Sequence, residues 1–97
     1  MSYRVHILPK AARTISGLGL ARETLVGLYT WLLTELAADP DAHLRDRLPP
    51  TGLWACSLTL GKPPRRQFFL FAIDRLEGTK LLEVVACRFT REDISDT

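Results

Sequence analysis

Three apolar runs in the second half of the chain constrain its fold most strongly. They cover residues 53–60, 67–74 and 80–89, and only short loops separate them. Short loops can join antiparallel strands, whereas parallel strands need a crossover of about a dozen residues or more. We therefore expect an antiparallel meander. Residues 68–73 are apolar without alternation, which predicts a central strand covered on both of its faces.

The first half of the chain favours one strand and two helices. Residues 3–8 alternate in polarity as a short strand does, and Pro9 suits the first position of a helix that ends near Gly17. A second helix is expected over 20–38, where apolar residues recur at helical spacing. The expected fold is therefore α+β in the order β-α-α-β-β-β, with an antiparallel two-helix hairpin packed on an antiparallel sheet.

Two further segments are less regular. Residues 41–52 contain Pro49, Pro50 and Gly52 and are expected to form a connector, with one turn of helix around 43–47. Near the end of the chain, Thr90 and Asp93 have the spacing of a capping box, which predicts a short C-terminal turn or helix.

Length and composition indicate the class of protein. The chain has 97 residues, of which 46% are hydrophobic, so we expect one domain spanning 1–97 with its own core. There is no signal-peptide pattern and no run near the roughly eighteen apolar residues of a membrane span, which predicts a cytoplasmic protein. Cys56 and Cys87 fall on the outer strands of the meander, about 9–10 Å apart. A disulfide needs less than about 7 Å, so both should be free.

Cations that lie far apart in the sequence are expected to meet at one end of the sheet. They belong to the first loop of the meander and to the end of its third strand: Lys62, Arg65, Arg66, Arg88 and Arg91. If the second turn centres on Glu77, Arg66 faces Arg88. Such a pair of like charges is tolerated when it is solvated or when an anion lies between, and arginine forks suit phosphate oxygens. The arrangement predicts a phosphate site, and the basic middle of the chain is a mild indication of nucleic acid.

Simpler interpretations of the same residues stay open. Arg88 is also placed for an ion pair with Glu92 or Asp93, and a solvated loop would carry the same charges. The two histidines, His6 and His43, belong to no Cys/His cluster with metal-ligand spacing, so we predict no metal. The sequence also lacks a Gly-rich phosphate loop and a HExxH motif, and no cofactor is predicted.

Three segments, together with the order of elements, resemble the RelE/ParE superfamily of toxin–antitoxin toxins. Residues 3–12, YRVHILPKAA, are similar to the family's opening strand and its proline-started helix. Residues 48–54, LPPTGLW, are similar to the entry into its second strand. Residues 68–74 and 84–88 are similar to its last two strands, so the resemblance covers most of the chain.

The resemblance implies a growth-inhibiting toxin that a cognate antitoxin protein holds inactive, in a homo- or hetero-oligomer whose size stays open. One kind of member is a ribosome-associated mRNA endonuclease, in which the 2′-hydroxyl attacks the adjacent phosphate without a metal; another kind poisons DNA gyrase. For a ribonuclease, Arg88 matches the family's arginine at the end of the last strand, and Arg66 lies close to the one that opens the preceding strand. Arg65 would add to the phosphate grip, and Lys62 or His6 would supply proton transfer.

Two departures from the family pattern favour a binding module without nuclease activity, either gyrase-directed or catalytically degenerate. Residues 54–58, WACSL, lack the basic residues that ribonuclease members often carry on this strand. Ile94 stands about where some of them place a catalytic tyrosine. A third interpretation is an unrelated small α+β protein whose cations only solvate a sheet edge.

Overall fold

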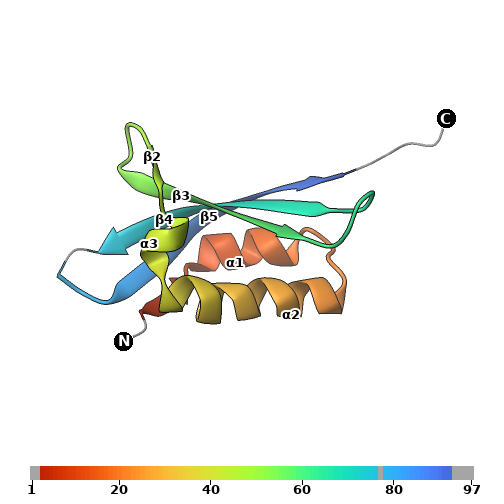
Figure 1. Cartoon of the computed structure of the whole chain (residues 1–97), viewed down its shortest axis with the longest axis horizontal. Helices are drawn as coiled ribbons and strands as arrows, with labels where there is room; N and C mark the ends of the chain where they lie inside the picture. The colour runs from red at the N-terminus through yellow and green to blue at the C-terminus, as the bar shows by residue number, and fades with distance from the viewer. Residues whose placement is uncertain (1–2, 77, 93–97) are drawn as a thin grey trace.

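One mixed sheet with helices against one of its faces makes up residues 3–76 and 78–92, which the computed structural model describes (Figure 1). The elements are β1 (Arg4–Ile7), α1 (Pro9–Ser16), α2 (Arg22–Thr30), η1 (Trp31–Leu36), α3 (Pro40–His43), β2 (Asp46–Leu48), β3 (Leu53–Leu60), β4 (Gln67–Leu76) and β5 (Leu81–Arg91). The sheet order is β1-β5-β4-β3-β2. The expected α+β fold is confirmed, but β1 runs parallel to β5, so the sheet is mixed rather than wholly antiparallel.

The helices lie where the sequence predicts them. α1 begins at Pro9, whose fixed φ suits a first helical position. α2 continues through the π-helical segment η1 and residues 37–38 as one uninterrupted helical stretch. Leu28, Leu32 and Leu36 follow one another at four-residue spacing and are fully buried. This stripe is the face that the long helical segment turns toward the sheet.

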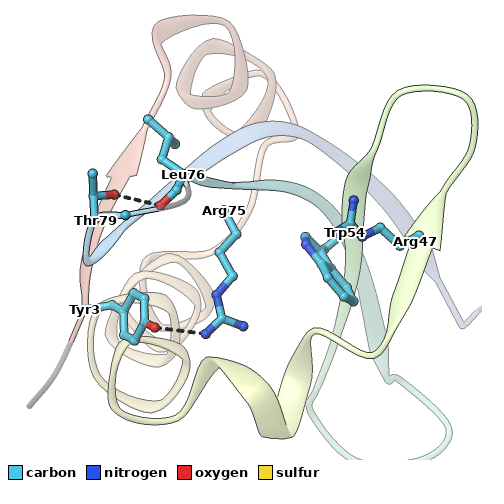
Figure 2. Close-up of a pocket in the computed structure, with 7 residues that line it drawn as sticks. Tyr3, Arg47, Trp54, Arg75, Leu76 and Thr79 are labelled. Atoms are coloured by element: carbon cyan, nitrogen blue, oxygen red, sulfur yellow. Dashed lines mark hydrogen bonds between the residues drawn. The ribbon is translucent and has the colours of Figure 1, made fainter.

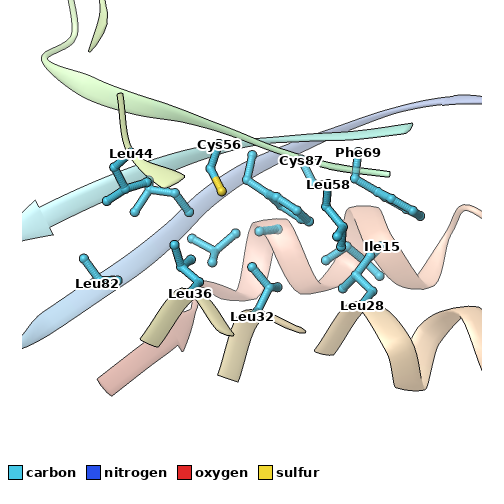
Figure 3. Close-up of a cluster of buried hydrophobic side chains, with 14 residues drawn as sticks. Ile15, Leu28, Leu32, Leu36, Leu44, Cys56, Leu58, Phe69, Leu82 and Cys87 are labelled. Atoms are coloured by element: carbon cyan, nitrogen blue, oxygen red, sulfur yellow. The ribbon is translucent and has the colours of Figure 1, made fainter. Parts of the chain in front are cut away.

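The hydrophobic core lies between this helical layer and the sheet (Figure 3). β4 contributes Phe69, Phe71 and Ile73, none more than 1% exposed. The remaining members of the cluster are Ala11, Ile15, Leu28, Leu32, Leu36, Leu44, Cys56, Leu58, Leu82, Val84 and Cys87. Because burying one large apolar side chain contributes about 1.5–3 kcal/mol, this contact between layers is the main source of stability.

The other face of the sheet, which we call the open face, carries no helix of the described chain. α1 and α2 lie together on one side of the sheet in Figure 1. Leu70 is 42% exposed, although its neighbours Phe69 and Phe71 are buried. The expectation of a central strand covered on both faces is therefore wrong. Side chains alternate along a strand, so a continuous apolar run supplies core residues only at every second position.

A short strand, β2, lies in the segment that was expected to be a connector. It pairs with the start of β3, with Asp46 opposite Ala55 and Leu48 opposite Leu53. The turn between them is closed by Thr51, whose amide and hydroxyl donate to the carbonyl of Leu48 at 3.1 and 2.7 Å. The two prolines occupy this turn rather than a strand interior, where a missing amide donor would break the ladder.

β4 and β5 pair with one shift in register. Ala72 lies opposite Ala86, whereas Ile73 lies opposite Val84. Val85 therefore has no partner on β4 and forms a β-bulge. Beyond the bulge, β5 runs on to Arg91.

The ends of the meander complete the comparison with the sequence. Thr90 lies within β5 opposite Phe68, so it does not begin a helix, and Asp93 lies outside the described residues. Cys56 and Cys87 lie on either side of Phe71 and are free, as their spacing predicts. None of the helices in the described ranges is both long and apolar enough to cross a membrane.

Candidate anion-binding groove

The first loop of the meander and the end of β5 lie side by side at one end of the sheet (Figure 1). The amide of Glu92 donates to the carbonyl of Arg66 at 2.8 Å, and Gln67 pairs with Arg91. The segments that carry the predicted cations are therefore neighbours. Their charged side chains are arranged differently from the expectation.

Arg66 faces Glu92, so the predicted pairing of Arg66 with Arg88 is wrong. The Nη2 atom of Arg66 lies 2.6 Å from Oε2 of Glu92, and Nε lies 3.1 Å from each carboxylate oxygen. The Arg66 amide also donates to Oε1 at 3.2 Å. The hydrogen bond from Arg66 holds the pKa of the Glu92 carboxyl below its usual value and raises the pKa of the guanidinium. The ion pair considered for Arg88 is formed by Arg66 instead.

The second turn and the bulge together explain this difference in register. The turn begins after Leu76 and ends before Leu81, so its centre lies later than the expected Glu77. The bulge then adds one more residue to β5. Both changes move Arg88 away from the start of β4 and place it opposite Leu70.

Arg88 and Arg91 point to opposite faces of the sheet. They are three positions apart with no bulge between them, and successive strand side chains alternate. Arg91 shares the helix side with Phe89, and its guanidinium carbon lies 5.5 Å from the centre of that ring. Arg88 lies beside Leu70 on the open face. The five predicted cations thus share one end of the sheet without forming one cluster.

Lys62 and Arg65 are both exposed in the loop between β3 and β4. The amide of Arg65 donates to the carbonyl of Lys62 at 2.8 Å and closes a turn. Gly61 permits this turn with a φ of +84°, where a Cβ would lie 3.0 Å from the Arg65 carbonyl oxygen. Both side chains therefore lie in solvent at the same end of the sheet as Arg66.

His6 lies too far from these cations to act with them. It pairs with Glu83 at the start of β5, with 3.6 Å between Nδ1 and Oε2. Glu83 precedes Arg88 by five positions, which corresponds to about 17 Å along a strand. Asp74 lies directly opposite Glu83, so this end of the open face carries carboxylates. It is not suited to an anion.

Arg88 forms one wall of a shallow hollow on the open face. The hollow has a volume of about 330 Å³, and Leu70, Ala72 and Ala86 line it together with Leu48 from the β2–β3 hairpin. Small alanines on adjacent strands leave room above the sheet, while the hairpin supplies the opposite side. The result is an apolar floor beside one exposed guanidinium.

A second hollow of about 300 Å³ adjoins the first, and Leu70 lines both. Its polar lining comes from the segment before and within β2 and from β3: His43, Arg45, Asp46 and Ser57. Ser57, Leu70 and Arg88 lie in one row across β3, β4 and β5. We call the two hollows together the open-face groove. Neighbouring strands are about 4.8 Å apart, so Ser57 and Arg88 are about 10 Å apart across the sheet, with Arg88 lining the first hollow and Arg45 the second.

The polar groups of the second hollow were not identified from the sequence as site residues. His43, Arg45 and Asp46 fall in a segment that is expected to be a connector. The pairing of β2 with β3 places Asp46 opposite Ala55, while His43, at the end of α3, and Arg45 line the hollow from beside β3. The imidazole of His43 also packs edge-on against Trp31, with 5.0 Å between ring centres and an interplanar angle of 71°. Chemically, the groove offers two guanidinium groups for an anion and two side chains able to accept a proton.

The two thiols near the groove are not nucleophiles at neutral pH. Burial raises the pKa of Cys56 to about 12 and that of Cys87 to about 11. Since the thiolate is the reactive form, both side chains act as small core residues.

Residues 3–76 and 78–92 contain no group of three or more His, Cys, Asp or Glu side chains that could hold a metal ion. Comparisons with protein-family models, with curated proteins and with solved structures find no match to this chain.

Proposed function

We propose that this protein is a RelE/ParE-like toxin that grips an RNA strand in the open-face groove. The position of Arg88 carries the proposal, because this exposed guanidinium stands beside the apolar floor at Leu70. An arginine fork matches the oxygens of a phosphate, and a nucleobase can pack on the apolar surface next to it. Arg45 on the second hollow would hold a neighbouring phosphate.

The same groove supports cleavage of the strand that it holds. In the family's chemistry, the 2′-hydroxyl attacks the adjacent phosphate, its proton passes to a base, and the departing oxygen receives a proton. Arg88 would stabilise the charge that develops on the reacting phosphate. His43 and Asp46 line the groove and take the proton-transfer role that sequence reasoning gave to Lys62 or His6.

A binding module that inhibits growth without cleaving RNA is the second candidate function. The outward positions of β3 favour it, since they carry Ala55, Ser57 and Thr59 instead of basic residues. The contact between His43 and Trp31 also favours it, because a packed imidazole has a structural role of its own. DNA gyrase is then the expected target class, as the resemblance implies.

Induced expression with mapping of mRNA 5′ ends tests both candidates. The wild-type protein should slow growth and generate new 5′ ends, and co-expression with a neighbouring antitoxin should prevent both effects. The variant Arg88→Ala should reduce cleavage at least tenfold. The matched control is Arg13→Ala, which removes an exposed arginine from α1 on the helix side and should change nothing.

The outcomes separate the candidates. Cleavage that needs Arg88 but not Arg13 supports the nuclease, and a further loss in His43→Gln assigns proton transfer to that residue. Growth inhibition without RNA fragments supports the binding module. If a folded Arg88→Ala protein cleaves RNA and inhibits growth like the wild type, the proposed groove is wrong. Circular dichroism of each variant shows whether it is folded.

A further inference from the structure

A further pocket, separate from the two hollows of the open-face groove, lies at the other end of the sheet, where the chain turns from β4 to β5 (Figure 2). Its volume is about 420 Å³, within the roughly 300–1,000 Å³ of small-molecule sites. Trp54 pairs with the buried Ile73, and Arg75 follows two positions later on the same face of β4. The pocket therefore lies on the helix side and shares no residue with the open-face groove.

Trp54 forms an aromatic wall that is held in place. The guanidinium carbon of Arg47 lies 4.3 Å from the centre of the Trp54 ring, and Nη1 of Arg47 donates to the carbonyl of Gly52 at 3.2 Å. In the view of Figure 2, Arg47 lies beyond the indole, and Arg75 lies on the side toward Tyr3. An indole with a cation stacked on one face is positioned to receive a planar group on the other.

Arg75 is a fixed cation at the same pocket. Its Nη1 donates to Oδ1 of Asp41 at 2.6 Å, and its Nη2 donates to the hydroxyl of Tyr3 at 2.9 Å. These bonds raise the pKa of Arg75, so the guanidinium stays charged. Lys80 lies next to the pocket lining, with Nζ 4.7 Å from the centre of the Tyr3 ring. The net charge around the pocket is positive, because the three positive charges of Arg47, Arg75 and Lys80 outnumber the one negative charge of Asp41.

We propose that this pocket binds a nucleoside monophosphate. The base stacks on Trp54, and the phosphate contacts Arg75 and Lys80. Aromatic and cationic groups at one pocket match the two chemical parts of that ligand, because every base has a face for stacking and a phosphate accepts from guanidinium groups. The proposal goes beyond the proposed function, since it concerns another face of the sheet and a separate ligand.

Fluorescence titration of Trp54 tests the proposal directly. The chain has two tryptophans, so Trp31→Phe leaves Trp54 as the reporter. Adenosine monophosphate should quench its fluorescence with saturation. Adenosine and inorganic phosphate should each bind at least tenfold more weakly, because each provides only one of the two contacts.

Three variants in this background locate the site. Arg75→Gln should weaken binding at least tenfold. Asp41→Asn keeps the guanidinium but removes its counter-charge, so binding should tighten severalfold. Arg88→Gln, on the open face, should bind like the parent protein. Thermal melting of each variant shows that it is folded.

Each other outcome overturns the proposal. Absence of saturation at millimolar adenosine monophosphate removes the site, and equal affinity for inorganic phosphate reduces it to general anion binding. Weaker binding in Asp41→Asn, or a loss in Arg88→Gln, places the nucleotide elsewhere. A loss in Arg88→Gln would move the nucleotide to the open-face groove, and the other results do not bear on RNA cleavage there, so failure of one proposal is distinguishable from failure of the other.

Discussion

Arg66 and Glu92 join the start of β4 to the end of β5 through both backbone and side chains. Glu92 donates its amide to the carbonyl of Arg66, and Arg66 donates its amide and its guanidinium to the carboxylate of Glu92. Because Nε and Nη2 of Arg66 both donate to Glu92, this guanidinium has few donors left for a phosphate. In the proposed function, phosphate binding therefore depends on Arg88, which lies on the open face of β5, opposite Leu70.

Removing the Glu92 charge should destabilise the protein slightly and in a pH-dependent way. Arg66 holds the pKa of Glu92 below its usual value, so the stabilisation is present above the unfolded pKa of about 4.3. It is lost as the pH falls through the lower pKa of the folded state. Glu92→Gln should therefore melt a little below the wild type at neutral pH, with the difference vanishing in acid. Thermal melts across this range check it, and a constant difference would contradict it.

Two adjacent leucines in η1 should differ sharply in their contribution to stability. Leu32 is fully buried, whereas Leu33 is 52% exposed. Leu32→Ala should lower the free energy of unfolding by about 2–5 kcal/mol because it leaves a cavity in the core. Leu33→Ala should stay within about 0.5 kcal/mol of the wild type. Urea denaturation of both variants measures the contrast, and equal losses would mean that the helix is rotated from the position described.

A carboxylate beside Arg88 should block the open-face groove. Leu70 is directly opposite Arg88, so Leu70→Glu introduces an internal anion that competes with an RNA phosphate. RNA affinity should fall at least tenfold, and more at low salt than at high salt. Leu70→Gln is the matched control, since it has the same shape without the charge and should lose much less. Similar losses in both variants would point to the apolar floor rather than to charge.

The cysteines should react slowly while the protein is folded. Burial raises the pKa of Cys87 to about 11 and that of Cys56 to about 12. An unperturbed thiol has a pKa of about 8.5, so Ellman's reagent near pH 8 should modify the native protein at least tenfold more slowly than the denatured protein. Mass spectrometry of an alkylated sample should find Cys87 modified before Cys56. Rapid modification of the native protein would contradict the burial of both.

Much of the fold follows from local sequence signals. The short loops indicate the meander, and Pro9 indicates the start of α1. β2 could not be predicted because three residues beside two prolines carry too weak a pattern, and their strand exists only through pairing with β3. The second turn and the bulge likewise depend on how β4 and β5 pack together.

The site was predicted less well for the same reason. His43, Arg45 and Asp46, which line the second hollow, come from a segment that carries no motif, and a shared hollow is a property of three-dimensional packing. The observed register differs from the expected one, so Arg66 pairs with Glu92 and does not face Arg88. A cationic cluster inferred from strand pairing is only as accurate as the position of one turn.

The bulge at Val85 decides which side of the sheet receives the arginine on which the proposed function depends. Before it, Leu82 and Val84 point into the core; after it, Cys87 does, while Ala86 and Arg88 point outward. Even-numbered residues of β5 face the core before this unpaired residue, and odd-numbered residues face it afterwards. If Val85 were instead taken up into a regular ladder, the two sides of the strand beyond it would exchange, sending a guanidinium toward the helices and a thiol into water, whereas deletion of Val85 would leave both on their present sides. Among homologous chains, the open-face position of Arg88 would therefore survive the loss of this residue but not the loss of the bulge with the residue retained.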